Sequence, residues 1–221
     1  MKILTLRIYN STHDYDSMYK LHKQYDTNSI YLISSTSITE PNYNPETQML
    51  TVPGKESLIP GILEKTILGI EYCLKNFEFD VLIRSNMSTV IDYVELKNQL
   101  SKINNPYGGH IWGFSFQNEP FNFVSGCCIV LNKDICNYLL ENKNDLVYHL
   151  PDDVAIGFLL RKQFHSTFYT QYCQKNIISD NTCFYRFRND LTRYTNRETD
   201  INNMEIFYQK LYTVITPDKS Q

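Results

Sequence analysis

Apolar and polar positions alternate in two different rhythms along the first half of the chain. Short apolar runs predict buried strands, and apolar positions that recur every three or four residues predict helices. Strands are expected over residues 3–8, 29–34 and 80–84, with a short one over 49–52, and helices over 13–25, 59–74 and 89–103. Strands that alternate with helices in this way are typical of a largely parallel sheet with helices on both faces.

The second half of the chain has more closely spaced elements. Strands are expected over residues 110–116, 123–131, 166–172 and 183–189, and helices over 133–141, 154–160 and 203–213. No stretch has the composition of an interdomain linker, so residues 1–221 are predicted to form a single domain. The predicted fold class is α/β, with a mixed Rossmann-like sheet flanked by helices.

The composition disfavours some classes of partner and of site. The 221 residues carry 21 Lys and Arg against 24 Asp and Glu, which disfavours a nucleic-acid binder that relies on bulk positive charge. None of the six cysteines has the C-x-x-C spacing of a zinc ribbon or redox motif, and Cys127 and Cys128 are expected in the core. The chain opens on an apolar strand, and no apolar run approaches a membrane span. We therefore expect a soluble, cytoplasmic protein that does not insert into membranes.

Two adjacent carboxylates, Asp152 and Asp153, distinguish the stretch 150–157. Neighbouring carboxylates repel each other, and burial raises the pKa of either one above the usual value of about 3.9. Pro151 precedes the pair and an apolar helix follows it, so the acids fall at a helix N-terminus, where negative charge is favoured. From this stretch alone, an Asp N-cap for a buried helix and a catalytic carboxylate are equally good interpretations.

Four separated segments occur in the same order as in a known enzyme family. They are residues 64–66, 83–88, 123–134 and 150–157. The specific parts are a Ser-Gly-x-x-x-x-Leu-x-x-Asp run in the third segment and a Pro-Asp-Asp-x-x-x-Gly run in the fourth. Across residues 56–160 the chain resembles the Fringe and β-1,3-galactosyltransferase-like glycosyltransferases, which have the GT-A fold. The Asn-rich, Ala-poor composition resembles the soluble members that large DNA viruses carry.

The resemblance implies a reaction as well as a fold. It implies an inverting transfer of a sugar from a nucleotide sugar, expected here to be a UDP-sugar, to a hydroxyl of a glycan or another acceptor. Residues 1–103 would bind the donor, and residues 104–221 would hold the acceptor and the catalytic groups. Asp153, the second acid of the pair, would be the general base, a role that contributes about 10²–10⁴-fold in rate. Asp152 would cap the helix or help to hold the acceptor.

The metal-binding positions depart from the family pattern. The family holds a divalent metal with an Asp-x-Asp motif at the end of the central strand, where this chain has Asn86, Met87 and Ser88. Neutral side-chain oxygens are poorer ligands than carboxylates for Mg²⁺ or Mn²⁺. A histidine ligand near the C-terminus is also missing from the corresponding region, residues 184–188. We therefore predict an enzyme without a cofactor or metal, with Mn²⁺ or Mg²⁺ dependence as the alternative.

Basic side chains are the candidates to replace the metal beside the donor diphosphate. The predicted donor-binding residues are Lys65, Arg84, Asn86, Ser88, Arg186 and Arg188. Arg186 and Arg188 alternate on one predicted strand and would face the same side, as a guanidinium clamp on phosphate requires. Ion pairs between these two arginines and surface acids are an equally good explanation of their presence.

Ser125, Gly126 and Trp112 are the candidates for acceptor binding. Gly126 would let the backbone approach a sugar closely, although a glycine bulge in a buried strand explains it nearly as well. Trp112 could stack on the face of a sugar ring, but core packing is the favoured interpretation of this one tryptophan.

Two other functions compete with glycosyl transfer. A catalytically silent carbohydrate- or nucleotide-binding module would account for the altered metal positions, but it has little use for a costly carboxylate pair. A nucleotidyltransferase shares the α/β pattern, yet it normally needs acidic metal ligands and a Gly-rich phosphate loop. The sequence contains neither signal.

Overall fold

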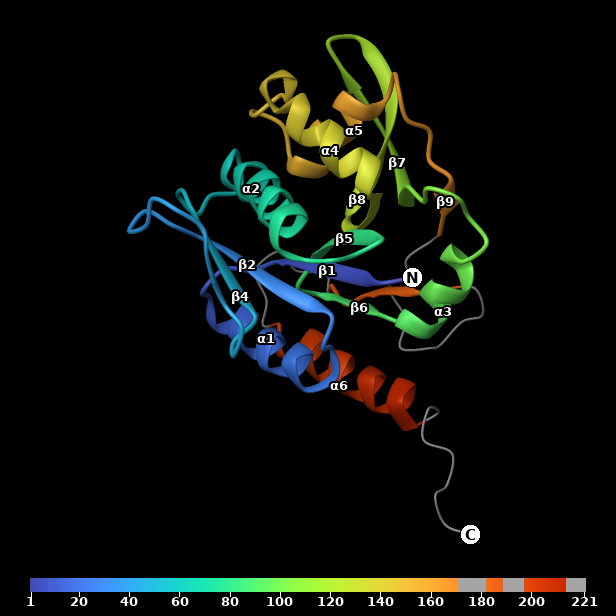
Figure 1. Cartoon of the computed structure of the whole chain (residues 1–221). Coiled ribbons are helices and arrows are strands. Elements are labelled where there is room, and N and C mark those ends of the chain that lie inside the picture. The colour runs from blue at the N-terminus through green and yellow to red at the C-terminus, as the bar shows by residue number, and fades with distance from the viewer. Residues whose placement is uncertain (171–181, 189–196, 214–221) are drawn as a thin grey trace.

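A mixed sheet of eight strands runs through the centre of the molecule (Figure 1). The computed structural model describes residues 1–170, 182–188 and 197–213, and every element named below lies within these ranges. Across the sheet the strands are β3 (Asn42–Asn44), β4 (Met49–Pro53), β2 (Ser29–Ser35), β1 (Ile3–Ile8), β5 (Val81–Asn86), β8 (Glu119–Asn132), β7 (Gly108–Phe116) and β9 (Phe168–Tyr169). The predicted fold class, α/β with a mixed sheet flanked by helices, is confirmed.

Strand β1 lies at the centre of the parallel part of the sheet. It pairs in parallel with β2 on one side and with β5 on the other, and β2 pairs in parallel with β4. Strands β5 and β8, β8 and β7, and β3 and β4 pair antiparallel. The chain leaves β1 towards β2 and later returns to β5 on the opposite side, so the strand order reverses between β1 and β5. In open α/β sheets the crevice at the carboxyl ends of such strands is the usual ligand site.

Six α-helices of the described ranges cover the sheet. They are α1 (His13–Tyr25), α2 (Gly61–Asn76), α3 (Tyr93–Leu100), α4 (Lys133–Glu141), α5 (Asp152–Leu160) and α6 (Glu198–Thr213), with a short 3₁₀ turn η1 (Lys143–Asp145). In Figure 1, α2, α4 and α5 lie on one side of the sheet, and α1 and α6 lie on the other. None of these helices is both long enough and apolar enough to cross a membrane.

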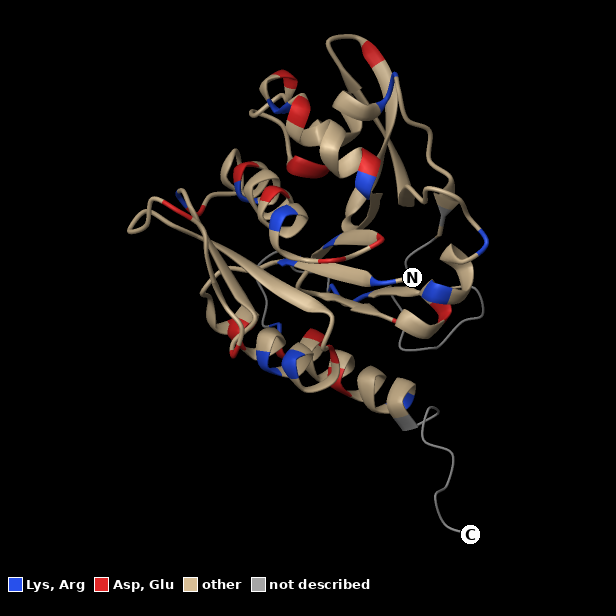
Figure 2. Ribbon diagram, viewed as in Figure 1, with Lys and Arg blue, Asp and Glu red and all other residues tan. Residues whose placement is uncertain are grey.

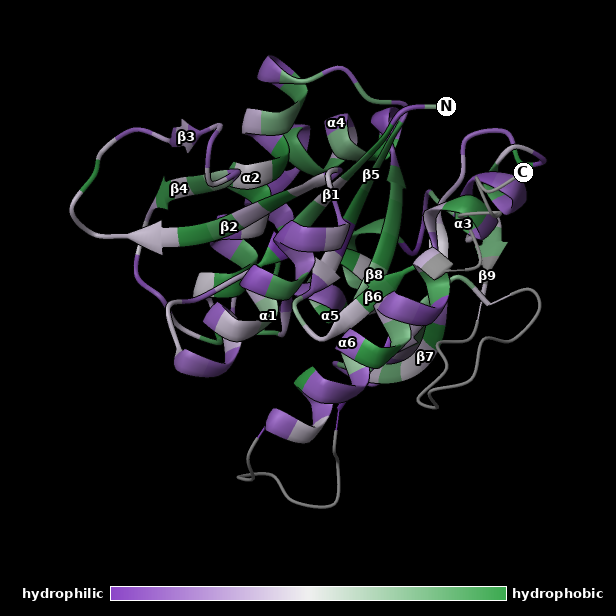
Figure 3. Ribbon diagram, turned by 90° about the horizontal axis from the view of Figure 1, so that it is seen from below, coloured by the Kyte–Doolittle hydropathy of each residue, from purple (hydrophilic) through white to green (hydrophobic). Residues whose placement is uncertain are grey.

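The core forms where the apolar faces of the helices meet the sheet. Leu6, Leu32 and Leu82 of the central strands are fully buried, in one cluster with Leu63 and Ile70 of α2. Figure 3 shows hydrophobic colour over much of the central strands, where residues 81–83 of β5 and 127–131 of β8 are apolar and buried. Charged residues of both signs are spread over the helices and turns (Figure 2).

Residues 89–91 do not begin a helix, so the prediction of a helix over 89–103 is wrong at its start. They form strand β6 (Thr89–Ile91), which pairs antiparallel with β10 (Phe184–Arg186) in a separate two-stranded sheet. Asp92 then caps α3, because its carboxylate accepts from the backbone N–H groups of Val94 and Glu95 at 3.0 Å each. The local pattern of apolar residues suits a helix or a strand, and pairing with a distant segment selects the strand.

Two late strands are shorter than predicted, and one hairpin is longer. Strand β9 covers two residues of the predicted 166–172, and β10 covers three of the predicted 183–189; residues 171–172, residue 189 and Cys173 lie outside the described ranges. Strands β7 and β8 form a long hairpin whose turn residues, Gln117 and Asn118, both have positive φ angles. A two-residue turn of this type matches the twist of the flanking strands.

A buried polar cluster lies between the sheet and the helices α1 and α6. Arg7 Nη2 lies 2.8 Å from Asp26 Oδ2, and neither side chain is exposed to solvent. Arg7 Nη1 also donates to the carbonyl of Thr89 at 2.8 Å. His22 is fully buried, with Nε2 2.6 Å from the carbonyl oxygen of Met87 and Nδ1 2.6 Å from the Tyr208 hydroxyl. These contacts fix the backbone of the turn that follows β5.

His22 generates a prediction for the pH dependence of stability. Burial and the nearby Arg7 charge lower the pKa of His22 to about 3, whereas an unfolded histidine titrates near 6.5. Below pH 6.5 the unfolded chain therefore binds a proton that the folded protein refuses, and the folded state loses stability as the pH falls. The loss from this group is about 2 kcal/mol between pH 7 and pH 5.

A His22→Gln variant removes this contribution, so its free energy of unfolding is expected to change less than that of the wild type between the two pH values. Urea unfolding at pH 7 and pH 5 measures the difference. An identical pH dependence in both proteins would contradict a neutral, buried His22.

Candidate active site

The two adjacent acids lie at the start of α5, but neither caps it. Pro151 occupies the N-cap position, and no side chain bonds to the free N–H groups from there. Asp152 is the first helical residue and is 6% exposed, while Asp153 is half-buried. The predicted capping role of Asp152 is therefore wrong. Its carboxylate turns instead towards the sheet, where a cation meets it.

Arg84 of β5 forms a buried ion pair with Asp152. Arg84 Nη2 lies 2.9 Å from Asp152 Oδ1 and 2.8 Å from Oδ2, and Arg84 itself is 2% exposed. Its other terminal nitrogen, Nη1, donates to Asn86 Oδ1 at 2.7 Å and to the carbonyl of Gly126. Burial raises the pKa of the Asp152 carboxyl, the Arg84 charge opposes this rise, and the neighbouring Asp153 adds to it. One guanidinium thus joins β5, β8 and α5.

Asp153 has a different environment from its neighbour. Its Oδ2 accepts from the backbone N–H of Gly126 at 2.7 Å, and its Oδ1 from that of Val154 at 3.0 Å. Within the part of the chain that the structure describes, no Lys, Arg or His forms an ion pair with it. The two adjacent carboxylates therefore differ in their partners. Asp152 is buried and paired with a cation, whereas Asp153 is half-buried and accepts hydrogen bonds from neutral backbone N–H groups.

Gly126 lies where Arg84 and Asp153 come close to the backbone of β8. A Cβ atom at this position would lie 2.8 Å from Arg84 Nη1 and 3.1 Å from Asp153 Oδ2. Strand β8 also departs from regular pairing here, because residues 125–128 fall between paired positions where β7 has one residue. The bulge interpretation of Gly126 is thus confirmed, and the missing side chain makes room for the ion pair. Contact of Ser125 or Gly126 with an acceptor stays a prediction; Ser125 is 6% exposed.

A cavity of about 260 Å³ adjoins this network at the carboxyl ends of β1 and β5. Its wall is made by the segment after β1, the start of α1, the start of α2 and the end of β5; the lining residues include Tyr9, Asn10, Tyr15, Glu56, Lys65 and Asn86. Asn86 connects it to the acids, since its amide oxygen is the acceptor for Arg84. The cavity occupies the point at which the strand order reverses, the usual ligand site of such sheets.

Lys65 lies in the wall of this cavity with its charge already paired. Lys65 Nζ lies 2.8 Å from both carboxylate oxygens of Glu56 and donates to the carbonyl of Tyr9 at 2.7 Å. The side chain is 1% exposed, and burial lowers its pKa while Glu56 opposes the change. Sequence reasoning missed Tyr9 and Glu56. Tyr9 directly follows the first strand, so the rule for strand-order reversal would have identified it.

The other predicted donor-binding residues lie around the turn after β5. Ser88 is 6% exposed, and its carbonyl accepts from the N–H of Phe187 at 2.8 Å, so the segment after β10 is bonded to this turn. Arg186 pairs with Thr89 across the small sheet. Burial raises the pKa of the Cys127 thiol, and the charges of Arg186 and Arg84 oppose this rise. Arg188 is exposed and lies beyond the end of β10. The proposed diphosphate clamp of Arg186 and Arg188 stays a prediction.

Trp112 is not a core residue, so the favoured interpretation of it is wrong. It is 50% exposed on β7, and among the described residues β9 pairs only with Gly108 and Gly109 of that strand. Phe123 lies opposite it on β8. Cys127 and Cys128 are both fully buried, as predicted.

Residues 86–88, where the resemblance would place metal ligands, do not fit a divalent cation. The amide oxygen of Asn86 is bonded to Arg84, the Met87 side chain is fully buried, and the Met87 carbonyl is bonded to His22. The nearest acid, Asp152, is already paired with Arg84. A guanidinium therefore occupies the centre of this group, and hard cations prefer carboxylate oxygens that are not bound elsewhere.

Neither a model of a known protein family nor a curated protein matches this chain.

The crowding at Gly126 gives a direct test of the site geometry. A Gly126→Ala variant forces the Cβ against a guanidinium that three partners hold, and a strained core position of this kind costs about 1–3 kcal/mol of unfolding free energy. Gly113→Ala on β7 is the matched control, because its Cβ would meet only the Asn122 side chain, at 3.9 Å. Chemical denaturation of both variants measures the two costs.

The control is expected to change the free energy of unfolding by less than about 0.5 kcal/mol. Equal effects of the two substitutions would show that Gly126 does not make room for the Arg84–Asp152 pair.

Proposed function

We propose that this protein is an inverting glycosyltransferase that transfers a sugar from a UDP-sugar to a hydroxyl of an acceptor, with Asp153 as general base. The observation that carries the proposal is the unequal pair of acids beside the cavity at the strand-order reversal. Asp152 is internally neutralised by Arg84, whereas Asp153 has no cationic partner among the described residues. A base must be free to take up a proton, and Asp153 meets this requirement.

In the proposed reaction, the donor nucleotide and the acceptor bind at different places. The donor nucleotide occupies the cavity between the segment after β1 and the start of α2, where Tyr9 and Tyr15 offer aromatic surface. Its diphosphate extends over Asn86 towards the acids. The acceptor hydroxyl approaches from the β8 side, and Asp153 removes its proton while the oxygen attacks the anomeric carbon. Backbone N–H groups of Gly126 and Val154 keep the Asp153 carboxylate aimed.

Positive charge without a metal is the second part of the proposal. Arg84 holds a permanent charge next to Asn86, and Arg186 acts from the neighbouring small sheet. Such fixed charges stabilise the diphosphate that leaves, because a guanidinium cannot be deprotonated in a protein and needs no reorganisation. Arg188 and Lys65 complete the predicted donor site, with Lys65 held in place by Glu56.

The acceptor side uses the exposed part of the β7–β8 hairpin. Half of the Trp112 side chain faces solvent, so its ring is available to stack on a sugar of the acceptor glycan. Ser125 and Gly126 line the approach to the base. We propose the cytoplasm as the location, in keeping with the five described cysteines, all of which are buried and free of disulfides.

One observation favours a second candidate, a catalytically silent nucleotide- or carbohydrate-binding module. Lys65, in the wall of the cavity, and Arg84, which is bonded to the lining residue Asn86, are both engaged by acids of the chain. Their donors are therefore not all available to a diphosphate. A module that only binds would tolerate this arrangement. A transferase needs positive charge that is not cancelled by these acids to stabilise the diphosphate that leaves.

An Asp153→Asn variant separates the two functions. The amide keeps the size of the side chain but cannot accept the proton, so transfer is expected to fall by about 10²–10⁴-fold while UDP still binds. Product formation from a panel of UDP-sugars, measured together with UDP affinity, gives both quantities. Asp145→Asn, a change at an exposed acid of η1, is the matched control and keeps full activity.

The same assay, run in EDTA and with added Mn²⁺, tests the arginine hypothesis. Equal rates under both conditions are expected. Strict dependence on Mn²⁺ would overturn the metal-free part of the proposal, and binding of UDP without turnover of any donor by the wild type would favour the silent module.

A further inference from the structure

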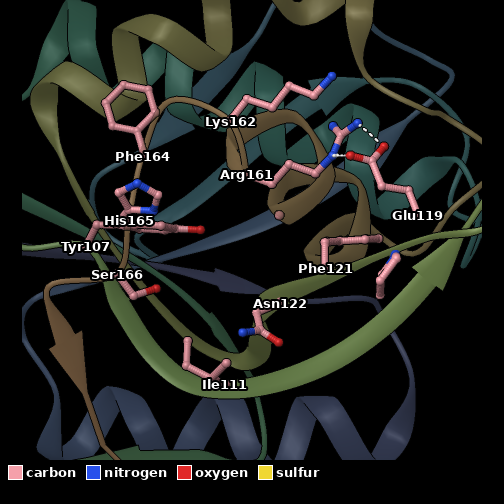
Figure 4. A pocket seen from close by; sticks show the side chains of 12 residues that line it. Tyr107, Ile111, Glu119, Phe121, Asn122, Arg161, Lys162, Phe164, His165 and Ser166 are labelled. Carbon is pink, nitrogen blue, oxygen red and sulfur yellow. Dashed lines mark hydrogen bonds and ion pairs between the residues drawn. The ribbon is translucent and has the colours of Figure 1, made fainter.

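A second cavity, of about 360 Å³, lies between the β7–β8 hairpin and the segment that follows α5. Figure 4 shows side chains from both converging on it. The neutral polar ones are those of Tyr107, Asn122 and Ser166, and the aromatic ones include Phe121 and Phe164. Nothing in the proposed reaction uses this cavity, which shares no lining residue with the one beside the acids.

The position of the second cavity relative to Asp153 follows from one face of α5. Asp153, Gly157 and Arg161 are spaced four residues apart and all meet strand β8. Their contacts there are with Gly126, Phe123 and Glu119, in that order. Arg161 lies about 12 Å from Asp153 along the helix axis, at 1.5 Å per residue. The cavity is therefore separate from Asp153, although both lie against the β7–β8 hairpin.

Tyr107 is the most informative residue in the wall of this cavity. It is 5% exposed, and its backbone is held firmly, since its N–H donates to Thr167 Oγ1 and its carbonyl accepts from Thr167 and Phe168. Its hydroxyl points into the cavity (Figure 4) and has no hydrogen-bond partner among the described residues. Burial raises the pKa of this hydroxyl, so it stays protonated and can donate. Because this hydroxyl opens onto the cavity, a ligand there can accept its hydrogen bond.

The charged residues in the wall of the cavity are Glu119, Arg161 and Lys162. Arg161 is bound by Glu119 through two contacts, Nε–Oε1 at 3.2 Å and Nη2–Oε2 at 2.7 Å. Its guanidinium also stacks over the Phe158 ring, 3.4 Å from the ring centre. This cation is therefore neutralised and fixed as part of the wall. Lys162 is exposed to solvent. The wall also carries the His165 imidazole, together with the hydroxyls of Tyr107 and Ser166 and the amide of Asn122, which both donate and accept hydrogen bonds.

We propose that this cavity binds a neutral saccharide unit through the Tyr107 hydroxyl, the Asn122 amide and the Ser166 hydroxyl. Sugar rings carry adjacent hydroxyls that match such mixed donors and acceptors, and their C–H faces pack on aromatic edges such as those of Phe121 and Phe164. The assignment of this unit to the acceptor rests on the proposed function. In that case, the cavity holds a part of the acceptor glycan that is remote from the attacking hydroxyl.

Binding of free oligosaccharides tests the site without any donor. The probes are lactose, cellobiose, maltose and xylobiose, with glucuronic acid and inorganic phosphate as anionic comparisons, followed by saturation-transfer NMR and titration on the full chain. The proposal predicts that at least one neutral disaccharide binds and that Tyr107→Phe weakens it about 5–20-fold. Asn122→Ala is expected to weaken it similarly. Tyr148→Phe, at a hydroxyl bonded to the Lys143 carbonyl outside the cavity, is the matched control and leaves binding unchanged.

The outcomes of this test separate the inference from the proposed function. Absence of binding by all four disaccharides, binding that Tyr107→Phe and Asn122→Ala leave intact, or preference for the anions would overturn the saccharide site. Glycosyl transfer measured in the same preparations would then still stand or fall by itself. Conversely, Asp153→Asn is expected to retain saccharide binding, so a protein that binds the disaccharide but transfers no sugar refutes the transferase and not the cavity.

Discussion

The buried ion pair between Arg84 and Asp152 is the interaction on which the candidate site depends. Removal of two charges from water is costly, and their attraction repays the cost only where the geometry is good and the remaining donors are satisfied. Here both carboxylate oxygens lie within 2.9 Å of one guanidinium nitrogen, and the second terminal nitrogen is bonded to Asn86 and Gly126, while Arg84 Nε has no hydrogen-bond partner among the described residues. The pair therefore joins a central strand, the long hairpin and α5 at a single point. The burial of Asp152 fixes the start of α5, and this holds Asp153 against the backbone of Gly126.

The turn that follows β5 is held from the opposite face of the sheet as well. Arg7 bonds to the carbonyl of Thr89, and His22 lies 2.6 Å from the carbonyl of Met87. Both side chains are fully buried. Asn86 thus has fixed backbone on one side and Arg84 on the other. The backbone of this turn is therefore held from both faces of the sheet.

Local sequence predicted those parts of the fold that depend on local periodicity, and it failed where distant segments decide. Helices α1, α2 and α4 follow from their own apolar faces. Residues 89–91 fit a helix equally well, and only pairing with β10 makes them a strand. Asp152 looked like a cap because nothing nearby reveals Arg84, which is 68 residues away. Trp112 looked like a core residue because the sequence of an apolar strand does not show which of its side chains face solvent. The acid pair, Gly126 and Arg84 were named as candidate residues, but the contacts that join them were not predicted.

A double-mutant cycle on Arg84 and Asp152 tests the central claim most directly. The free energy of unfolding, from urea denaturation at pH 7, is measured for Arg84→Met, Asp152→Leu and the variant that carries both. Each single change leaves one buried charge without its partner and is expected to cost about 3–5 kcal/mol, whereas the double change removes both charges and costs far less than the sum. Additive effects, or single changes that cost little, would show that the pair does not organise the site.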